Sequence, residues 1–181
     1  STQDLATAVN GTLERLRPGT PPLPLDVVRS YIGEGAGRLV SQSLARAELQ
    51  VTLETALEVF LEIYAGCLLE STRPYPGVQA ALQALSSSTL AVLTNKPGGF
   101  SRTILQGLGL LESFAAVVGG DEMPARKPDP GALLLLMERF QVTAGETLFV
   151  GDSAVDVATA RAAGVQVAGL RYGLDPEGLV A

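Results

Sequence analysis

Residues 147–164, with the sequence TLFVGDSAVDVATARAAG, constrain the fold more than any other part of this chain. Residues 148–150 favour a short strand buried on both faces, and the alanine-rich residues that follow have the period of an amphipathic helix. Asp152 then lies at the carboxyl end of the strand, where ligands bind in open α/β sheets, and Asp156 lies one helical turn further on. The pattern predicts a parallel α/β fold with a cation-binding edge. The alternative is that Asp152 or Ser153 serves only as the N-cap of the helix.

Two other predicted strands also end in polar residues. The apolar run 90–93 leads into the sequence TNKP at 94–97, and the run 115–118 leads through a glycine-rich loop to KPDP at 127–130. A hydroxyl can donate to a phosphate oxygen, a lysine can neutralise its charge, and two carboxylates can hold Mg²⁺, so together these groups favour phosphate chemistry. Taken singly, the first motif could be a turn, and the second a solvated loop in which Pro130 begins a helix.

The order LTN, KPDP and GDSxxD resembles the second, third and fourth motifs of the haloacid dehalogenase superfamily of phosphotransferases. Within that superfamily, the segments TNKPGGF, RKPDP, FVGDSAVDVATARAAG and YIGEGAGRLV are most similar to phosphoglycolate phosphatases. The resemblance extends from about Ser1 to Tyr172. Its motifs are specific for the superfamily and less specific for the substrate.

The resemblance implies an α/β fold with two parts, a helical cap domain at residues 1–73 and a Rossmann-like parallel-sheet core at residues 74–181. The spacing of apolar residues changes at the same place. It is helical to about Leu69, and after the Pro74–Gly77 segment strand patterns alternate with helix patterns. We expect helices to Leu16 and at 25–32, 37–47, 52–69, 78–85, 100–108, 130–140 and 155–163, and strands at 90–94, 115–119, 148–151 and 165–168.

One family motif is absent from these 181 residues. Relatives carry a nucleophilic aspartate in a DxDGT motif at the end of a first strand. In their sheet, that strand lies between the strands that correspond to those ending here at Thr94 and Asp152. No DxDGT motif occurs in residues 1–181. A sheet without that central strand would leave two unpaired edges facing each other inside the core. We therefore expect a further N-terminal segment of about 10–20 residues. Without it, residues 1–181 are expected to fold poorly and to be catalytically inert.

The resemblance implies roles for five residues of the core. Thr94 and the backbone N–H of Asn95 would bind the phosphoryl oxygens, and Lys127 would neutralise charge on the phosphate and the nucleophile. Asp152 would ligate Mg²⁺, with Asp156 as a second ligand or an orienting partner. The implied reaction is Mg²⁺-dependent hydrolysis of a small phosphate monoester, 2-phosphoglycolate foremost, through an aspartyl-phosphate formed on an aspartate upstream of Ser1.

Substrate selection would lie in the cap, because the core motifs handle only the phosphate. In the loop GEGAGR at 33–38, Gly35 would let the backbone lie close over the site, and Arg38 could reach a substrate carboxylate. The plainer alternative is a helix connection with a solvated arginine. Two other functions also stay open: a different phosphotransferase of the superfamily, such as a sugar phosphomutase or pyrophosphatase, and a catalytically inert phosphate-binding protein.

Composition excludes several classes of function. The 181 residues contain no histidine, which removes Ser-His-Asp and Cys-His hydrolases and His-ligated zinc. A net charge of −6 argues against nucleic acid and an anionic membrane as partners. The partner that the resemblance implies is a small phosphorylated substrate. The single Cys67 fits a reducing compartment, and no apolar run reaches about 18 residues, so we expect a cytoplasmic protein. Whether it is a monomer or a homodimer is not determined.

Overall fold

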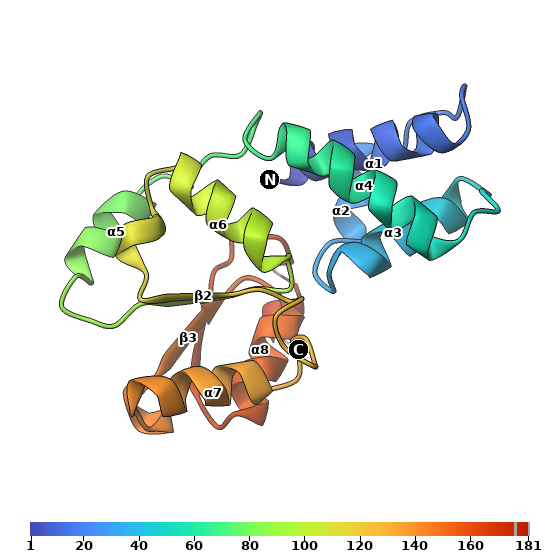
Figure 1. Ribbon diagram of the computed structural model, residues 1–181. Helices are drawn as coiled ribbons and strands as arrows, with labels where there is room; N and C mark the ends of the chain where they lie inside the picture. The colour runs from blue at the N-terminus through green and yellow to red at the C-terminus, as the bar shows by residue number, and fades with distance from the viewer. Residues whose placement is uncertain (176, 181) are drawn as a thin grey trace.

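The computed structural model describes residues 1–175 and 177–180. Its first part is a group of four helices that lie together (Figure 1), and the predicted end of the first helix at Leu16 is confirmed. Their bounds are α1 (Thr2–Leu16), α2 (Leu25–Ser30), α3 (Ala36–Arg46) and α4 (Leu53–Cys67). None of the helices in the described residues is long and apolar enough to cross a membrane.

The helices α1 and α4 form the centre of this group because each presents one apolar stripe. On α1, Leu5, Val9 and Leu13 recur every four residues and are buried. On α4, Phe60 and Tyr64 are both about 1% exposed, and they stack with ring centroids 5.5 Å apart. The two stripes pack against each other, with α2 and α3 completing the core. The Thr52 side chain begins α4 by accepting the Thr55 N–H at 3.3 Å.

The second part alternates helices and strands, and its strands are parallel, as predicted, so the α/β fold class is confirmed. Most element bounds fall within two residues of those expected. The elements are α5 (Val78–Ala84), β1 (Ala91–Leu93), α6 (Gly98–Gly107), β2 (Ala116–Val118), α7 (Gly131–Phe140), β3 (Leu148–Gly151), α8 (Ala154–Ala162) and β4 (Gln166–Gly169), with short 3₁₀ turns at Leu111–Ser113, Ala144–Glu146 and Gly178–Val180.

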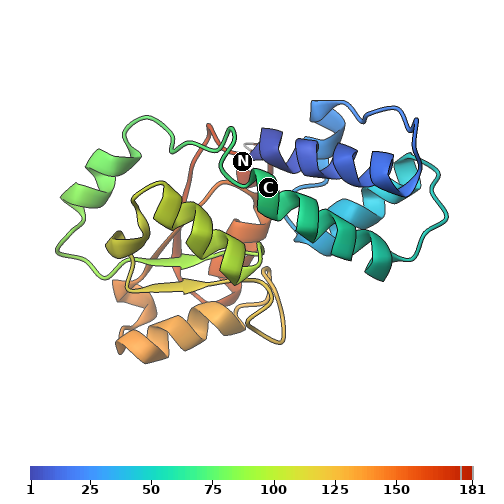
Figure 2. The same cartoon turned by 45° about the horizontal axis from the view of Figure 1, so that its top comes forward.

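The strands form two separate parallel pairs. In the first, β1 pairs with β2, and Val92 lies opposite Val117; in the second, β3 pairs with β4, and Phe149 lies opposite Val167. Within residues 1–175 and 177–180, no ladder joins the two pairs. The helix α6 contacts β2, α7 contacts β1, and α8 contacts β3 and β4. Figure 2 shows α6 and α7 on opposite sides of the β1–β2 pair.

The strand β3 is not buried on both faces, so this part of the sequence prediction is wrong. Phe149 is 8% exposed and packs with α7 and α8 residues in a second core cluster, but Leu148 and Val150 are 58% and 54% exposed. Alternate residues of a strand point to opposite faces. The physical reason is that no described element covers the Leu148 and Val150 side.

Polar contacts brace the helical group and join it to the rest of the chain. The Asp4 carboxylate accepts hydrogen bonds from the backbone N–H and the hydroxyl of both Ser71 and Thr72, at the exit from α4. The Arg29 guanidinium of α2 donates to the carbonyl oxygens of Gly173 and Leu174, at 2.9 and 3.2 Å. The Arg29 contacts join the helical group to the segment that follows β4. The domain boundary that we expect between residues 73 and 74 stays a prediction.

Candidate active site

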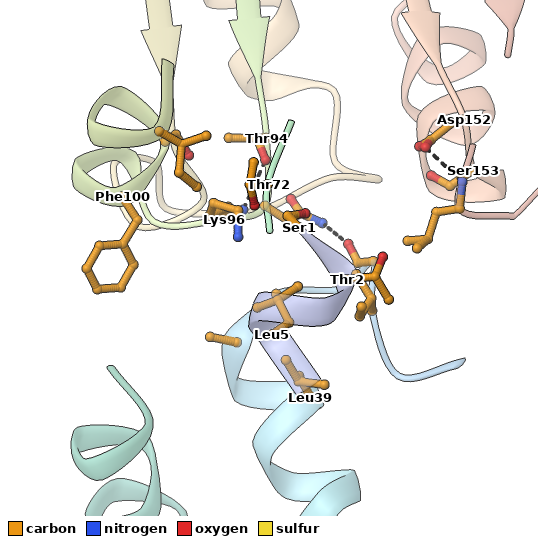
Figure 3. Close-up of a pocket in the computed structure, with 18 of the residues that line it drawn as sticks. Ser1, Thr2, Leu5, Leu39, Thr72, Thr94, Lys96, Phe100, Asp152 and Ser153 are labelled. Carbon is orange, nitrogen blue, oxygen red and sulfur yellow. Dashed lines mark hydrogen bonds between the residues drawn. The ribbon is translucent and has the colours of Figure 1, made fainter. Parts of the chain in front are cut away.

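A cavity of about 780 Å³ lies where the ends of β1 and β3 meet the helical group. Figure 3 shows Thr94 and Lys96 at the end of one strand, Asp152 and Ser153 at the end of the other, and the start of α1 close by. Six of the residues that line it were singled out from the sequence: Gly35, Thr94, Asn95, Lys127, Asp152 and Asp156. The fold therefore gathers the three predicted motifs around one space.

Lys127 and Asp156 form the central ion pair of this cavity. Lys127 Nζ lies 2.6 Å from Asp156 Oδ1, and the two side chains are only 12% and 7% exposed. Asp156 Oδ2 accepts the Ser153 hydroxyl at 2.7 Å and the Asp152 N–H at 3.1 Å. Lys127 Nζ also lies 5.6 Å from the centre of the Phe149 ring, on β3. The pair therefore joins the KPDP loop to the first turn of α8.

Protein contacts keep the Asp156 carboxyl ionised. Burial alone would raise its pKa, but the charge of Lys127 and the hydrogen bonds from Lys127, Ser153 and the Asp152 backbone hold the pKa below its ordinary value. The close turn depends on Gly151, because a Cβ at that position would lie 2.3 Å from Asp156 Cβ. The arrangement presents a fixed ammonium group to the cavity.

Asp152 faces the same cavity with fewer protein partners. Its Oδ2 accepts the Leu174 N–H at 2.8 Å, and its backbone carbonyl accepts the Asp175 N–H at 3.0 Å. A carboxylate at a strand end suits an oxygen-ligated cation such as Mg²⁺. The oxygens of Asp156, by contrast, are engaged by Lys127, Ser153 and the Asp152 N–H. The described residues contain no cluster of three His, Cys, Asp or Glu side chains around one point, and metal binding by either aspartate stays a prediction.

Asn95 contributes a contact that the sequence analysis did not anticipate. Its side chain accepts the Lys127 N–H at 3.0 Å and donates to the Lys127 carbonyl at 3.0 Å and to the Gly33 carbonyl at 2.9 Å. The side chain therefore holds the KPDP loop and the loop before α3 together. The neighbouring Thr94 donates its backbone N–H to the Val118 carbonyl at 3.0 Å, and its hydroxyl oxygen accepts the Lys96 N–H at 3.2 Å. The phosphate-binding roles of Thr94 and Asn95 stay predictions.

The structure separates the two residues predicted in the cap loop. Gly35 has a φ of +96°, and a Cβ there would lie 3.3 Å from the Asn95 carbonyl oxygen, so this glycine lets the loop lie against the core. Arg38 points elsewhere. It pairs with Glu34 at 3.0 Å with both side chains about half exposed, and it is not among the described residues that line the cavity. A substrate contact for Arg38 stays a prediction.

Lys96, two residues after Thr94, makes a contact that was not expected from the sequence. Its ammonium group donates to the Tyr64 hydroxyl and lies 4.5 Å from the centre of the Tyr64 ring. Burial lowers the pKa of Lys96 to about 8, and burial also raises the pKa of Tyr64. The signal was present in the sequence TNKP, but the aromatic partner lies on α4, 32 residues earlier in the chain.

Known proteins similar to this chain belong to one hydrolase family. The family model described as haloacid dehalogenase-like hydrolase matches residues 1–170. The chain is 43% identical over 180 residues to a phosphoglycolate phosphatase from Pseudomonas putida and 41% identical over 180 residues to one from Pseudomonas fluorescens. A crystal structure of a predicted phosphoglycolate phosphatase from Haemophilus somnus superposes with a TM-score of 0.88 at 32% identity, covering 98% of this chain and 82% of that one.

The two Pseudomonas proteins are longer than this chain. Each alignment covers 96% of this chain and 65% of the relative, so the chain spans just under two thirds of the length of these curated relatives.

Proposed function

Because this chain belongs to the haloacid dehalogenase-like hydrolase family, we propose that the protein is a phosphatase that hydrolyses 2-phosphoglycolate to glycolate and phosphate. The observation that carries the proposal is the cavity in which the Lys127–Asp156 ion pair, Asp152 and Thr94 lie together. The names of the relatives support the choice of substrate.

Each group in the cavity has a task in such a reaction. Lys127, oriented by Asp156, would neutralise charge on the phosphoryl group, and the Thr94 hydroxyl would donate to one of its oxygens. Asp152 would hold Mg²⁺, which supplies further positive charge to the phosphoryl oxygens when it is bound. The aromatic and aliphatic residues of α1 and α4 would keep bulk water away from the reacting phosphate.

The nucleophile would lie on a strand between β1 and β3. An aspartate at the carboxyl end of that strand would attack phosphorus, expel the glycolate alkoxide and form an aspartyl-phosphate, and water would then release phosphate and restore the carboxylate. Support comes from the facing edges of β1 and β3, which no described strand pairs, and from the exposed side chains of Leu148 and Val150. A DxDGT motif outside residues 1–181 would supply both the strand and the aspartate.

We also propose a cytoplasmic location and a small phosphorylated substrate as the partner, with no nucleic acid or membrane partner. Support comes from the net charge of −6 and from the single buried thiol, Cys67.

The direct test is Asp152→Asn in the full-length protein, assayed by phosphate release from 2-phosphoglycolate with and without Mg²⁺. We expect the wild type to need Mg²⁺ and the variant to lose activity by at least about 10²-fold, because a preorganised charge is removed. Asp26→Asn is the matched control, since Asp26 is exposed on α2. Unchanged activity in Asp152→Asn would refute the metal role.

A further inference from the structure

On the basis of the proposed function, we infer that Lys96 is a substrate-specificity residue whose ammonium group binds the carboxylate of a small phosphorylated acid. The cavity contains several positively charged side chains. Its described lining contains four cationic side chains: Arg29, Arg73, Lys96 and Lys127.

Three of these cations already have oxygen partners that suit them. Lys127 pairs with the carboxylate of Asp156. Arg29 donates to the carbonyl oxygens of Gly173 and Leu174, and Arg73 donates to carbonyl oxygens in the segment that follows α4. Each therefore has a structural contact in place before any ligand enters.

Lys96 differs from Lys127 in having no carboxylate partner, and it differs from the two arginines in that its ammonium group makes one hydrogen bond to the described residues, to a neutral phenol. The Tyr64 hydroxyl accepts from Nζ, and within the described part of the chain no carboxylate lies within 4.0 Å of this ammonium group. Asp4 is the nearby acid that influences Lys96, but its oxygens already accept four hydrogen bonds from Ser71 and Thr72. A half-buried ammonium without an anion is costly, and a ligand carboxylate would offset that cost.

The ammonium group is also held in place. Its Nζ lies over the Tyr64 ring at 4.5 Å, and that ring packs at right angles to Phe100 of α6, with centroids 5.4 Å apart. The Phe60 ring stacks on the Tyr64 ring, with centroids 5.5 Å apart. Because Tyr64 is about 1% exposed, the cluster has little freedom to move. A positioned cation of this kind can discriminate between ligands.

The distance along the chain between Lys96 and Thr94 limits the size of the ligand. Both residues belong to one turn after β1, where the Thr94 hydroxyl oxygen accepts the Lys96 N–H at 3.2 Å. A phosphate bound at Thr94 and a carboxylate bound at Lys96 must therefore belong to a small molecule. Since Tyr64 lies on α4, the same carboxylate would bind where the helical group meets the part of the chain that contains the strands.

The test compares two substrates that differ only in the carboxylate, 2-phosphoglycolate and ethyl phosphate, using the full-length protein. We expect Lys96→Met to lower kcat/KM for 2-phosphoglycolate by about 30-fold or more, since a charged hydrogen bond is lost, and to change kcat/KM for ethyl phosphate by less than about threefold. Lys96→Arg, which keeps the charge, should retain part of the preference. Arg46→Met, at an exposed site on α3, is the matched control.

Two results would overturn the inference. One is an equal loss on both substrates in Lys96→Met, which would indicate a structural role. The other is an unchanged preference in Lys96→Met with a lost preference in Arg38→Met, which would assign the carboxylate to the cap loop.

Calorimetric binding without Mg²⁺ separates this inference from the proposed function. If the wild type hydrolyses neither substrate but binds 2-phosphoglycolate more tightly than ethyl phosphate, and Lys96→Met abolishes that difference, the proposed function fails and the role of Lys96 stands. If the wild type shows no such difference in binding, the role of Lys96 fails.

Discussion

Lys127 and Asp156 lie 29 residues apart in sequence, yet Lys127 Nζ contacts Asp156 Oδ1 at 2.6 Å, with both side chains largely buried. This pair links two of the three motifs that define the cavity. Because Asp156 also accepts hydrogen bonds from Ser153 and the Asp152 backbone, it sets the position of both the ammonium group and the start of α8.

Breaking that pair should impair both folding and activity. We expect Lys127→Met to lower the free energy of unfolding by about 3 kcal/mol, because the partner carboxylate is left buried without its cation. Phosphate release should fall by at least about 10²-fold. Urea unfolding and steady-state kinetics check the two effects, and Arg46→Met serves as the control. A loss of activity with unchanged stability would contradict the structural part of this account.

The side chain of Asn95 should stabilise the contact between the KPDP loop and the loop before α3. Asn95→Ala removes three hydrogen bonds to Lys127 and Gly33, so we expect a loss of about 1–3 kcal/mol in the free energy of unfolding and a raised KM. Gln42→Ala, at an exposed position on α3, should change neither. A raised stability in Asn95→Ala would show that these contacts do not hold the loops.

A substitution at Gly151 tests how closely β3 approaches α8. Gly151→Ala would place a methyl group 2.3 Å from Asp156 Cβ, so we expect a loss of about 1–3 kcal/mol and a fall in activity as the ion pair shifts. Gly66→Ala is the matched control, because that site on α4 has no atom within 4 Å and should be neutral or slightly stabilising. Equal effects at the two positions, measured by urea unfolding, would contradict the assigned packing.

Acid should weaken the contact between α1 and the exit from α4. Burial alone would raise the pKa of Asp4, but the hydrogen bonds from Ser71 and Thr72 hold it below its ordinary value. A lowered pKa means that the contribution of Asp4 is present above the unfolded-state pKa of about 4 and is lost as pH falls through the folded-state pKa. The stability difference between the wild type and Asp4→Asn should therefore be largest near neutral pH and shrink in acid. A difference that grows in acid would refute this.

The preference for a carboxylated substrate should depend on pH through Lys96. Its pKa of about 8 means that the ammonium form exists below this pH and disappears above it. The charged groups that interact with it are Asp4 and the Ser1 amino group. Burial raises the pKa of the Tyr64 hydroxyl, so Tyr64 stays neutral over this range. The ratio of kcat/KM for 2-phosphoglycolate to that for ethyl phosphate should fall above about pH 8 in the wild type. In Lys96→Arg the ratio should stay flat.

The sequence predicted the architecture well because the elements follow simple periods. The change from helical to alternating patterns near residues 70–77 matches the order of elements, and the ends of β1 and β3 carry the predicted polar residues. Parallel strands bring their carboxyl ends to one region, so the gathering of Thr94, Lys127 and Asp152 could be foreseen without coordinates.

The sequence could not reveal contacts that depend on side chains far apart in the chain. The environment of Lys96 is created by Tyr64, and the exposure of Val150 depends on which elements cover the strand. Arg38 illustrates the same limit. The glycine-rich loop suggests a residue that reaches the site, and this stays a prediction; the ion pair of Arg38 with Glu34, four residues earlier, was not foreseen.

The measurement that tests the central claim most directly is phosphate release by the full-length protein from 2-phosphoglycolate, a hexose 1-phosphate and pyrophosphate, each with Mg²⁺. We expect kcat/KM for 2-phosphoglycolate to exceed the other two values by at least about tenfold, because only that substrate offers both a phosphate and a nearby carboxylate to the cavity. Faster turnover of the sugar phosphate or pyrophosphate, or no phosphate release from any of the three, would contradict the proposed function.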